Sequence, residues 1–188
     1  MSRWIAWVLR AALSVPILSA STAAAATWSL GTHLELAVLR SDVRNSGSNS
    51  IVALPASAFA YQPALRVGFA NVRHTEELSL DSGLFLVDEA GSTLSMLVAT
   101  ANVQHTFGSE RASAPFVSLG LGAFREGGAA RTSTVTTFGG GVGLRRCVHG
   151  DHGALRAELR ADYLHHAVEL GRPNLVTYGL RLGFDLWL

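Results

Sequence analysis

The final segment of the chain, residues 174–188, alternates between two kinds of side chain. From Val176 onward every second residue is apolar, and the residues between them, apart from Trp187, are polar or glycine. Arg181 and Asp185 lie on this second face. Side chains that alternate with a period of two lie on opposite faces of a β-strand. The pattern therefore predicts a β-strand with one apolar and one polar face, and the fold must supply suitable surroundings for both.

The amino-terminal segment has the three parts of a secretory signal peptide. Arg3 precedes a short apolar stretch, and a run rich in alanine, serine and threonine follows as far as Ala26. We predict that residues 1–26 are a signal peptide, which leaves residues 27–188 as a single domain. An uncleaved membrane helix is the alternative. Pro16 and the short apolar stretch disfavour it, because a spanning helix needs about 20 apolar residues.

The composition of the full sequence indicates which partners to expect. The formal net charge is +1 and every basic residue is arginine, so no polyanion is indicated and nucleic acid is not expected as a partner. The single cysteine, Cys147, excludes an internal disulfide and is interpreted as a small apolar strand residue. The longest later apolar run, residues 51–60, is interrupted by Pro55 and is too short to span a membrane as a helix. A chain of this kind is either a soluble periplasmic domain or a membrane β-barrel.

Further alternating segments recur along the chain at the spacing of β-hairpins. The predicted strands cover residues 28–40, 63–73, 77–87, 93–107, 115–125, 134–148, 154–164 and 174–188. Several strands at this spacing indicate a barrel or a sandwich, and an even number suits a closed up-and-down barrel. We therefore predict an all-β fold, an eight-stranded antiparallel up-and-down transmembrane β-barrel.

Alternation alone does not say which face points outward. A soluble, lipocalin-like ligand-binding barrel has its apolar face inside, whereas a membrane barrel has the reverse. Here the polar face consists of small residues and of arginines balanced by carboxylates, which suits a narrow lumen. We predict that this face lines the interior as a luminal charge network. Its members are Glu35, Arg66, Asp81, Arg145, Arg156, Glu158, Arg160, Asp162, Arg181 and Asp185.

The connections between the predicted strands alternate in length. With the amino terminus in the periplasm, one set of loops faces outward and a shorter set of turns faces the periplasm, as in bacterial outer-membrane barrels. The outward loops are residues 41–61, 88–92, 126–133 and 165–173. The periplasmic turns are residues 74–76, 108–114 and 149–153. The residues predicted for the aromatic girdles at the membrane surfaces are Trp28, Tyr163, Tyr178 and Trp187.

Two segments carry a family resemblance, the last strand from Tyr178 to Leu188 and the glycine-alternating strand from Pro115 to Phe124. Together they resemble the OmpA/OmpX-like group of small outer-membrane β-barrels. The resemblance implies an eight-stranded barrel embedded in the lipid of the bacterial outer membrane. We expect a monomer in contact with outer-membrane lipid and lipopolysaccharide. The resemblance also implies that the barrel-assembly machinery recognises the last strand during biogenesis. It implies no particular activity, so a structural or surface-interaction role is expected, with the loop at residues 41–61 as the candidate binding surface.

An enzymatic alternative rests on the segment from Tyr163 to Asn174. This segment is similar to the active region of lipid A deacylases, barrel hydrolases that use a histidine and a serine two positions later. His165 is followed at that spacing by Ala167, so no hydroxyl is present for a base to activate. We therefore expect no catalytic residues, and His165 and His166 are interpreted as polar residues at the level of the lipid headgroups.

Two further motifs suggest ligands only weakly. The turn from His149 to His152 contains two imidazoles and Asp151, but it lacks a nearby fourth ligand, and these are ordinary turn residues. The glycine run at residues 139–143 is not a phosphate-binding loop, because no Lys-Ser/Thr follows it. We therefore expect neither a metal nor a cofactor. His33 lies on the predicted luminal face near Glu35, where we expect a hydrogen-bonded imidazole.

Overall fold

The computed structural model describes residues 26–41, 51–53, 64–89, 92–109, 111–127, 132–148, 152–165 and 174–188, so the predicted signal peptide up to residue 25 lies outside the described residues. The strands are β1 (Thr27–Ser41), β2 (Ile51–Ala53), β3 (Ala64–Ala70), β4 (Glu76–Glu89), β5 (Ser92–Thr106), β6 (Ser113–Gly127), β7 (Thr132–Val148), β8 (Gly153–His165) and β9 (Leu175–Trp187). Within these ranges there is no helix long and apolar enough to span a membrane.

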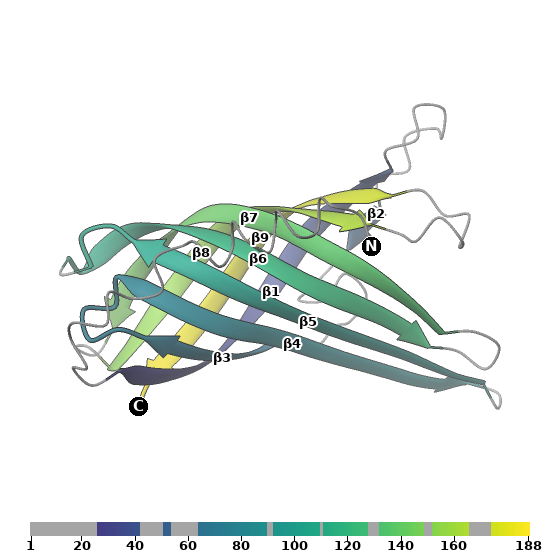
Figure 1. Ribbon diagram of the computed structural model, residues 1–188, viewed down its shortest axis with the longest axis horizontal. Helices are drawn as coiled ribbons and strands as arrows, with labels where there is room; N and C mark the ends of the chain where they lie inside the picture. Colours follow the sequence, from purple (N-terminus) through teal and green to yellow (C-terminus); the bar gives the residue numbers. More distant parts are fainter. Residues whose placement is uncertain are drawn as a thin grey trace, which may run out of the picture.

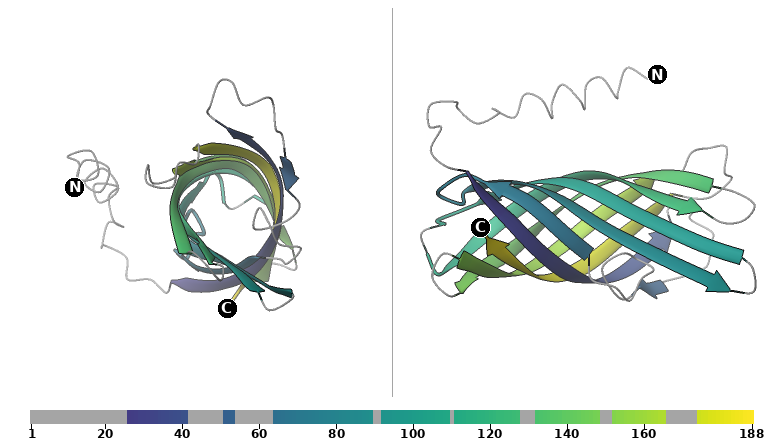
Figure 2. Two further views of the ribbon diagram at one scale, coloured as in Figure 1. Left: turned by 90° about the vertical axis from the view of Figure 1, so that its right-hand side faces the viewer. Right: turned by 90° about the horizontal axis from the view of Figure 1, so that it is seen from below.

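The strands form one closed antiparallel sheet. From β3 to β9 each strand pairs with the next along the chain, and pairing of β1 with β9 closes the ring, which Figure 2 shows end-on. The predicted eight-stranded up-and-down barrel is confirmed. The β1–β9 ladder runs from Ser29 opposite Trp187 to Ser41 opposite Leu175, so the two ends of the barrel domain are joined by a long run of hydrogen bonds.

One side of β1 is shared by two short strands, which corrects the predicted loop at residues 41–61. β3 pairs with the first half of β1, and β2 pairs with its second half, with Ala37 opposite Ala53 and Leu39 opposite Ile51. Ile51–Ala53 is thus strand and not loop, because its β-branched residues extend the β1 ladder (Figure 1). The rest of that loop lies outside the described residues.

The hairpin turn between β3 and β4 is fixed by one side chain. The Oδ1 atom of Asn71 accepts hydrogen bonds from the backbone N–H of Thr75 at 2.9 Å and of Glu76 at 3.3 Å. His74 adopts a φ of 50° within the turn. The strand therefore ends at Ala70, earlier than the predicted residue 73, because Asn71 redirects the backbone.

This turn gives a direct prediction. Replacing Asn71 by alanine removes both acceptor contacts, and we expect the free energy of unfolding to fall by about 1–2 kcal/mol. Asn71→Asp keeps the acceptor oxygens and should retain most of the stability. Equilibrium urea unfolding in phospholipid vesicles measures both variants, and equal losses for the two would contradict this account of the turn.

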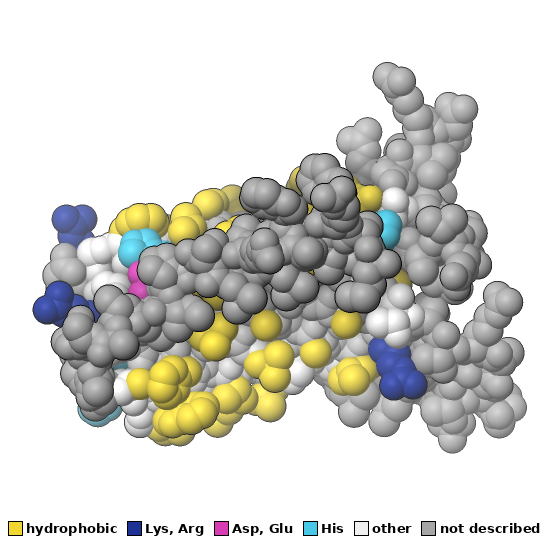
Figure 3. Space-filling view, viewed as in Figure 1, with side chains coloured by type: hydrophobic (Ala, Val, Ile, Leu, Met, Phe, Trp, Pro, Cys, Tyr) yellow, Lys and Arg dark blue, Asp and Glu magenta, His cyan; other side chains and the backbone are white. Residues whose placement is uncertain are grey.

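The two faces of the sheet differ as the alternation requires. On β3 the side chains of Ala64, Arg66 and Ala70 are buried, whereas Leu65 and Phe69 between them are exposed. The same arrangement continues around the barrel, and Figure 3 shows hydrophobic side chains over the visible outer wall. A soluble lipocalin-like barrel requires the opposite arrangement.

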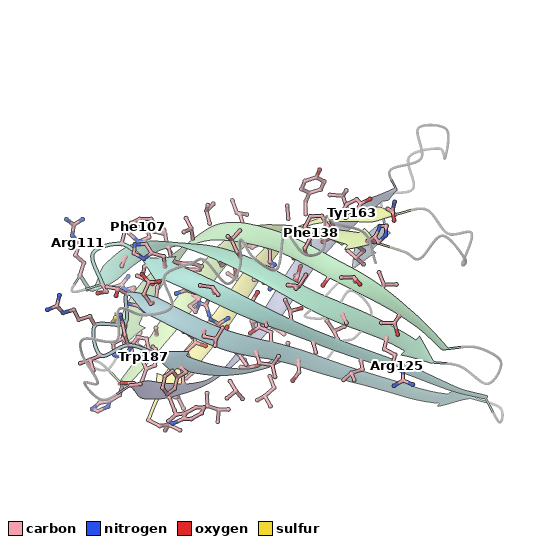
Figure 4. The ribbon with its side chains drawn as sticks, viewed as in Figure 1. Phe107, Arg111, Arg125, Phe138, Tyr163 and Trp187 are labelled. Atoms are coloured by element: carbon pink, nitrogen blue, oxygen red, sulfur yellow. The ribbon has the colours of Figure 1, made fainter. Side chains whose placement is uncertain are left out.

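The apolar outer wall indicates the surroundings of this barrel. Exposed leucines in this number would cost about 25 cal/mol per Å² of apolar surface in water, and hydrocarbon removes that cost. In the short turn at residues 71–75 the ring of His74 stacks on Trp187. Phe107 and Arg111, at the short turn between β5 and β6, lie at the same end of the barrel as Trp187 (Figure 4). This is the end that faces the periplasm in a barrel of this topology.

The predicted girdle residues do not all face outward. Trp28 and Tyr178 are more than half exposed on the outer wall, and Trp28 packs edge-on against Phe69. Trp187 is buried at 6% exposure inside the barrel, so its assignment to a girdle is wrong. It lies on the same face of β9 as Asp185, and that face points into the lumen.

Candidate functional site in the barrel lumen

The inward face of the barrel holds most of its charged side chains. We call Arg66, Glu77, Asp81, Arg156 and Asp185 the central cluster. Their side chains are at most 8% exposed. β3 and β4 bring Arg66 and Asp81 together because the two residues are direct cross-strand partners.

Arg66 joins three carboxylates within the central cluster. Its Nη2 lies 3.0 Å from Glu77 Oε1, and its Nη1 lies 3.2 Å from Asp81 Oδ1. Its Nε lies 3.5 Å from Asp185 Oδ1, and the other oxygen of Asp185 lies 3.3 Å from Arg156 Nη1. The planar guanidinium presents donors in several directions, which allows one residue to bridge several acids.

A second group of charges lies closer to the outer end of the lumen. We call Glu35, Glu158, Arg160, Asp162 and Arg181 the outer cluster. Arg181 Nε lies 2.7 Å from Glu35 Oε2, and Arg160 Nε lies 2.7 Å from Asp162 Oδ2. Arg181 lies opposite Glu35 on β1 and opposite Glu158 on β8. The register of β9 therefore determines both partners.

The two clusters form one network. Arg181 Nη1 lies 3.7 Å from Asp81 Oδ2 and its Nη2 lies 3.7 Å from Asp162 Oδ2, so this arginine touches members of both groups. Such distances are those of a shared charged environment and not of strong hydrogen bonds. The consequence is a continuous set of ion pairs that joins β8 and β9 to β1, β3 and β4.

Uncharged polar side chains extend the network across the barrel. Arg156 on β8 donates to Gln104 on β5, and Asn102 on β5 donates to Asp81 on β4 at 3.0 Å. Ser29 on β1 donates to Glu77 at 3.2 Å. The bonds from Arg156 and Ser29 join strands that are not neighbours in the sheet, so side chains occupy the middle of the lumen.

Within the described part of the chain, a small cavity lies in the lumen. Its volume is about 10 Å³, and its lining includes His33, Arg66, Asp81 and Arg181. This is the size of a single water molecule. His33 is buried there at 7% exposure, on the luminal face where the sequence placed it.

Arg145 is separate from the other predicted network members. The ion pairs found among the described residues do not include it. Its guanidinium lies 5.2 Å from the centre of the Trp187 ring, and Nη1 donates to the backbone oxygen of His74 at 2.9 Å. The rings of His74 and Trp187 stack at 4.3 Å. Arg145 therefore packs in an aromatic layer that covers the periplasmic end of the lumen.

Sequence reasoning missed several inward-facing residues. Glu77 was not assigned although it precedes Ser79 and Asp81 at a spacing of two, which is the signal that would have found it. With Glu77, six carboxylates line the described lumen against five arginines. The buried Val135 and Leu164 pack together, so part of the interior is apolar.

The remaining histidine motifs lie on the outside or beyond the described ranges. His165 is exposed on the outer wall, and its ring stacks on Tyr163 at 6.3 Å. His166 and Ala167 lie outside the described residues, as do His149 and Asp151. Among the residues that the structure covers, no three potential metal ligands lie together.

Comparison with known proteins identifies the fold. No protein-family model and no characterised protein matches the sequence. Neisserial surface protein A (NspA) superimposes with a TM-score of 0.61 at 17% identity, over 87% of this chain and 99% of that one. A major outer membrane protein of Thermus thermophilus gives a TM-score of 0.55 at 12% identity, over 88% of this chain and all (100%) of the other. The chain has the fold of small bacterial outer-membrane barrels, in line with its apolar outer wall.

Proposed function

We propose that this protein is a non-conducting barrel of the bacterial outer membrane with a structural or surface-interaction role. One observation carries the proposal: among the described residues, hydrogen bonds and ion pairs cross the lumen around a cavity of about 10 Å³. A continuous water path is needed to pass solutes, and bonded side chains fill the place where it would run. A barrel of eight strands has an interior just wide enough for side chains to fill.

The partners that this role requires are those of an integral barrel. Lipid and lipopolysaccharide surround the apolar wall, and the barrel-assembly machinery inserts the chain through its last strand, β9. The complete β1–β9 ladder supports a monomer. Because β1 and β9 pair with each other, neither offers a free strand edge at this seam to another chain.

We expect that the protein does not hydrolyse lipid A. The similar segment of lipid A deacylases pairs its histidine with a serine, and Ala167 stands at that position here. Incubation of the purified protein with lipopolysaccharide should therefore leave its acylation unchanged by mass spectrometry. Loss of an acyl chain that depends on His165 would favour the hydrolase.

Electrical recording tests the closed lumen. In planar lipid bilayers the wild-type barrel is expected to show no steady single-channel conductance. The variant with Gln104→Ala and Arg156→Ala removes the link between β5 and β8 and should show more frequent ion-conducting events. Arg146→Ala serves as the control, because Arg146 is exposed on the outer wall. A steady conductance of the wild-type barrel would overturn the proposal.

A further inference from the structure

The outer wall carries a groove of about 720 Å³ over β6, β7, β8 and β9. We call it the wall groove; its outward-facing lining includes Leu119, Gly140, Val142, Leu159, Ala161 and Tyr178. Leu119, Gly140, Ala161 and Tyr178 lie in one row across the four strands, each opposite the next. Two small residues therefore lie side by side between two large ones.

We call Gly140 and Ala161 the floor of the groove. Large side chains also flank this floor in the direction of the barrel axis. On one side Phe138 and Tyr163 face each other across β7 and β8, with ring centres 5.1 Å apart (Figure 4). On the other side Val142 and Leu159 face each other and are 58% and 63% exposed. The wall is therefore recessed at Gly140 and Ala161.

Gly140 leaves room for the side chain of Leu119 at the β6 edge of the groove. A Cβ atom added at this position would lie 2.8 Å from the backbone oxygen of Ser118 and 2.9 Å from Leu119 Cδ2. Both distances are below ordinary contact, so a larger residue would displace Leu119. Ala161 next to it is exposed and marks the open part of the floor.

The part of the groove on β8 and β9 lies near the outer ends of these strands. β8 ends at His165, four residues beyond Ala161, and β9 begins at Leu175, three residues before Tyr178. Both strands end within about 15 Å of these residues, given a rise of about 3.3 Å per residue. The lining is continuous with the lipid-facing wall, so acyl chains surround it, and those of the outer leaflet reach its β8–β9 end.

We propose that the wall groove is a binding site for one saturated acyl chain of an outer-leaflet lipid. A chain in the recess contacts the floor and the two flanking rows at once, whereas a chain on the even parts of the wall has contacts on one side. Dispersion contacts are small singly and add up over many atoms, so the recess holds a chain longer. The hydroxyl groups of Tyr163 and Tyr178 give the outer rim a polar end beside the lipid headgroups. The site depends on the membrane location but not on the closed lumen.

Photolabelling tests the site. The folded barrel is placed in phosphatidylcholine vesicles that contain a trace of phosphatidylcholine with a diazirine midway along one saturated acyl chain. After illumination, mass spectrometry of the peptides measures labelling at Tyr178. Ala161→Leu fills the floor and is expected to lower that labelling several-fold.

A matched control isolates the groove from general changes of the wall. Ala101 is also exposed on the outer wall, but it lies between Leu80 and Leu121 and outside the groove. Ala101→Leu should leave labelling at Tyr178 at the wild-type level. Ala161→Val, with a smaller side chain, should give an intermediate value and carries the test if the leucine variant fails to fold.

Three outcomes would overturn the proposal. The first is equal labelling at Tyr178 in the wild type and both Ala161 variants. The second is an equal loss in Ala101→Leu. The third is crosslinked barrel dimers formed through the groove, which would make a second copy the occupant. Since folding is checked by heat-modifiable gel migration and conductance is measured separately, failure here is distinguishable from failure of the closed-lumen proposal.

Discussion

Replacing Arg66 by methionine is expected to lower the free energy of unfolding by about 3–5 kcal/mol, the cost of removing one partner from a buried ion pair. Arg66 bridges Glu77, Asp81 and Asp185 at 3.0–3.5 Å, and all four side chains are almost fully buried. Methionine retains much of the volume but no charge. The three carboxylates would then keep only Arg156, 3.3 Å from Asp185, and the more distant Arg181, 3.7 Å from Asp81.

Two further variants separate charge from packing. Adding Asp81→Asn to Arg66→Met removes one of the carboxylate charges that lost its partner, so the double variant should recover part of the stability. A double-mutant cycle measures this coupling. Arg146→Ala removes an exposed arginine and should change stability by less than about 0.5 kcal/mol. Equilibrium urea unfolding in vesicles, followed by the fluorescence of the buried Trp187, measures all of them. If Arg66→Met and Arg146→Ala cost the same, the central cluster is not a stabilising network.

The sequence predicted the strands and their two faces because alternation is a local property. Leu65, Arg66 and Val67 show their opposite orientations within three residues, and no knowledge of the rest of the fold is needed. The structure confirms the barrel and places the residues of the predicted network on its inner face, Arg66 and Asp81 as direct neighbours among them. Strand ends were less predictable, since Asn71 acts through a turn that the alternation does not report.

Local sequence patterns could not predict which side chains contact one another inside the lumen. Arg145 lies on the same polar face of β7 as the glycine run. Its position along the barrel axis brings it to Trp187 on β9 and to His74 in a distant turn. Trp187 looked like an interfacial aromatic because it lies at a strand end. Its inward orientation follows from the face that it shares with Asp185, and its partners follow from barrel closure. Such contacts depend on the registers of several strands at once.

The surroundings of the outer wall are tested by placing an arginine at an apolar, outward-facing position, where a large loss of stability is expected. Leu80 on β4 is 51% exposed, lies between Val67 and Ala101 on the outer wall, and is about 13 Å along the strand from its start at Glu76. We expect Leu80→Arg to lower the free energy of unfolding in vesicles by about 2–4 kcal/mol, the cost of a charged side chain near the centre of a bilayer. On a water-exposed surface the same change would alter stability by only about 0.5 kcal/mol. The result therefore depends on what surrounds the wall.

Position along the barrel axis supplies the control. Val72 is also exposed, at 49%, but it lies in the turn at the periplasmic end, where an arginine should cost about 0–1 kcal/mol. Leu80→Ala measures the loss of the leucine side chain without a charge. A depth-dependent cost for arginine, large at Leu80 and small at Val72, requires a hydrocarbon layer around the middle of the barrel. Equal and small costs at both positions would mean that water surrounds the wall, and the leucine-rich face would then need another partner.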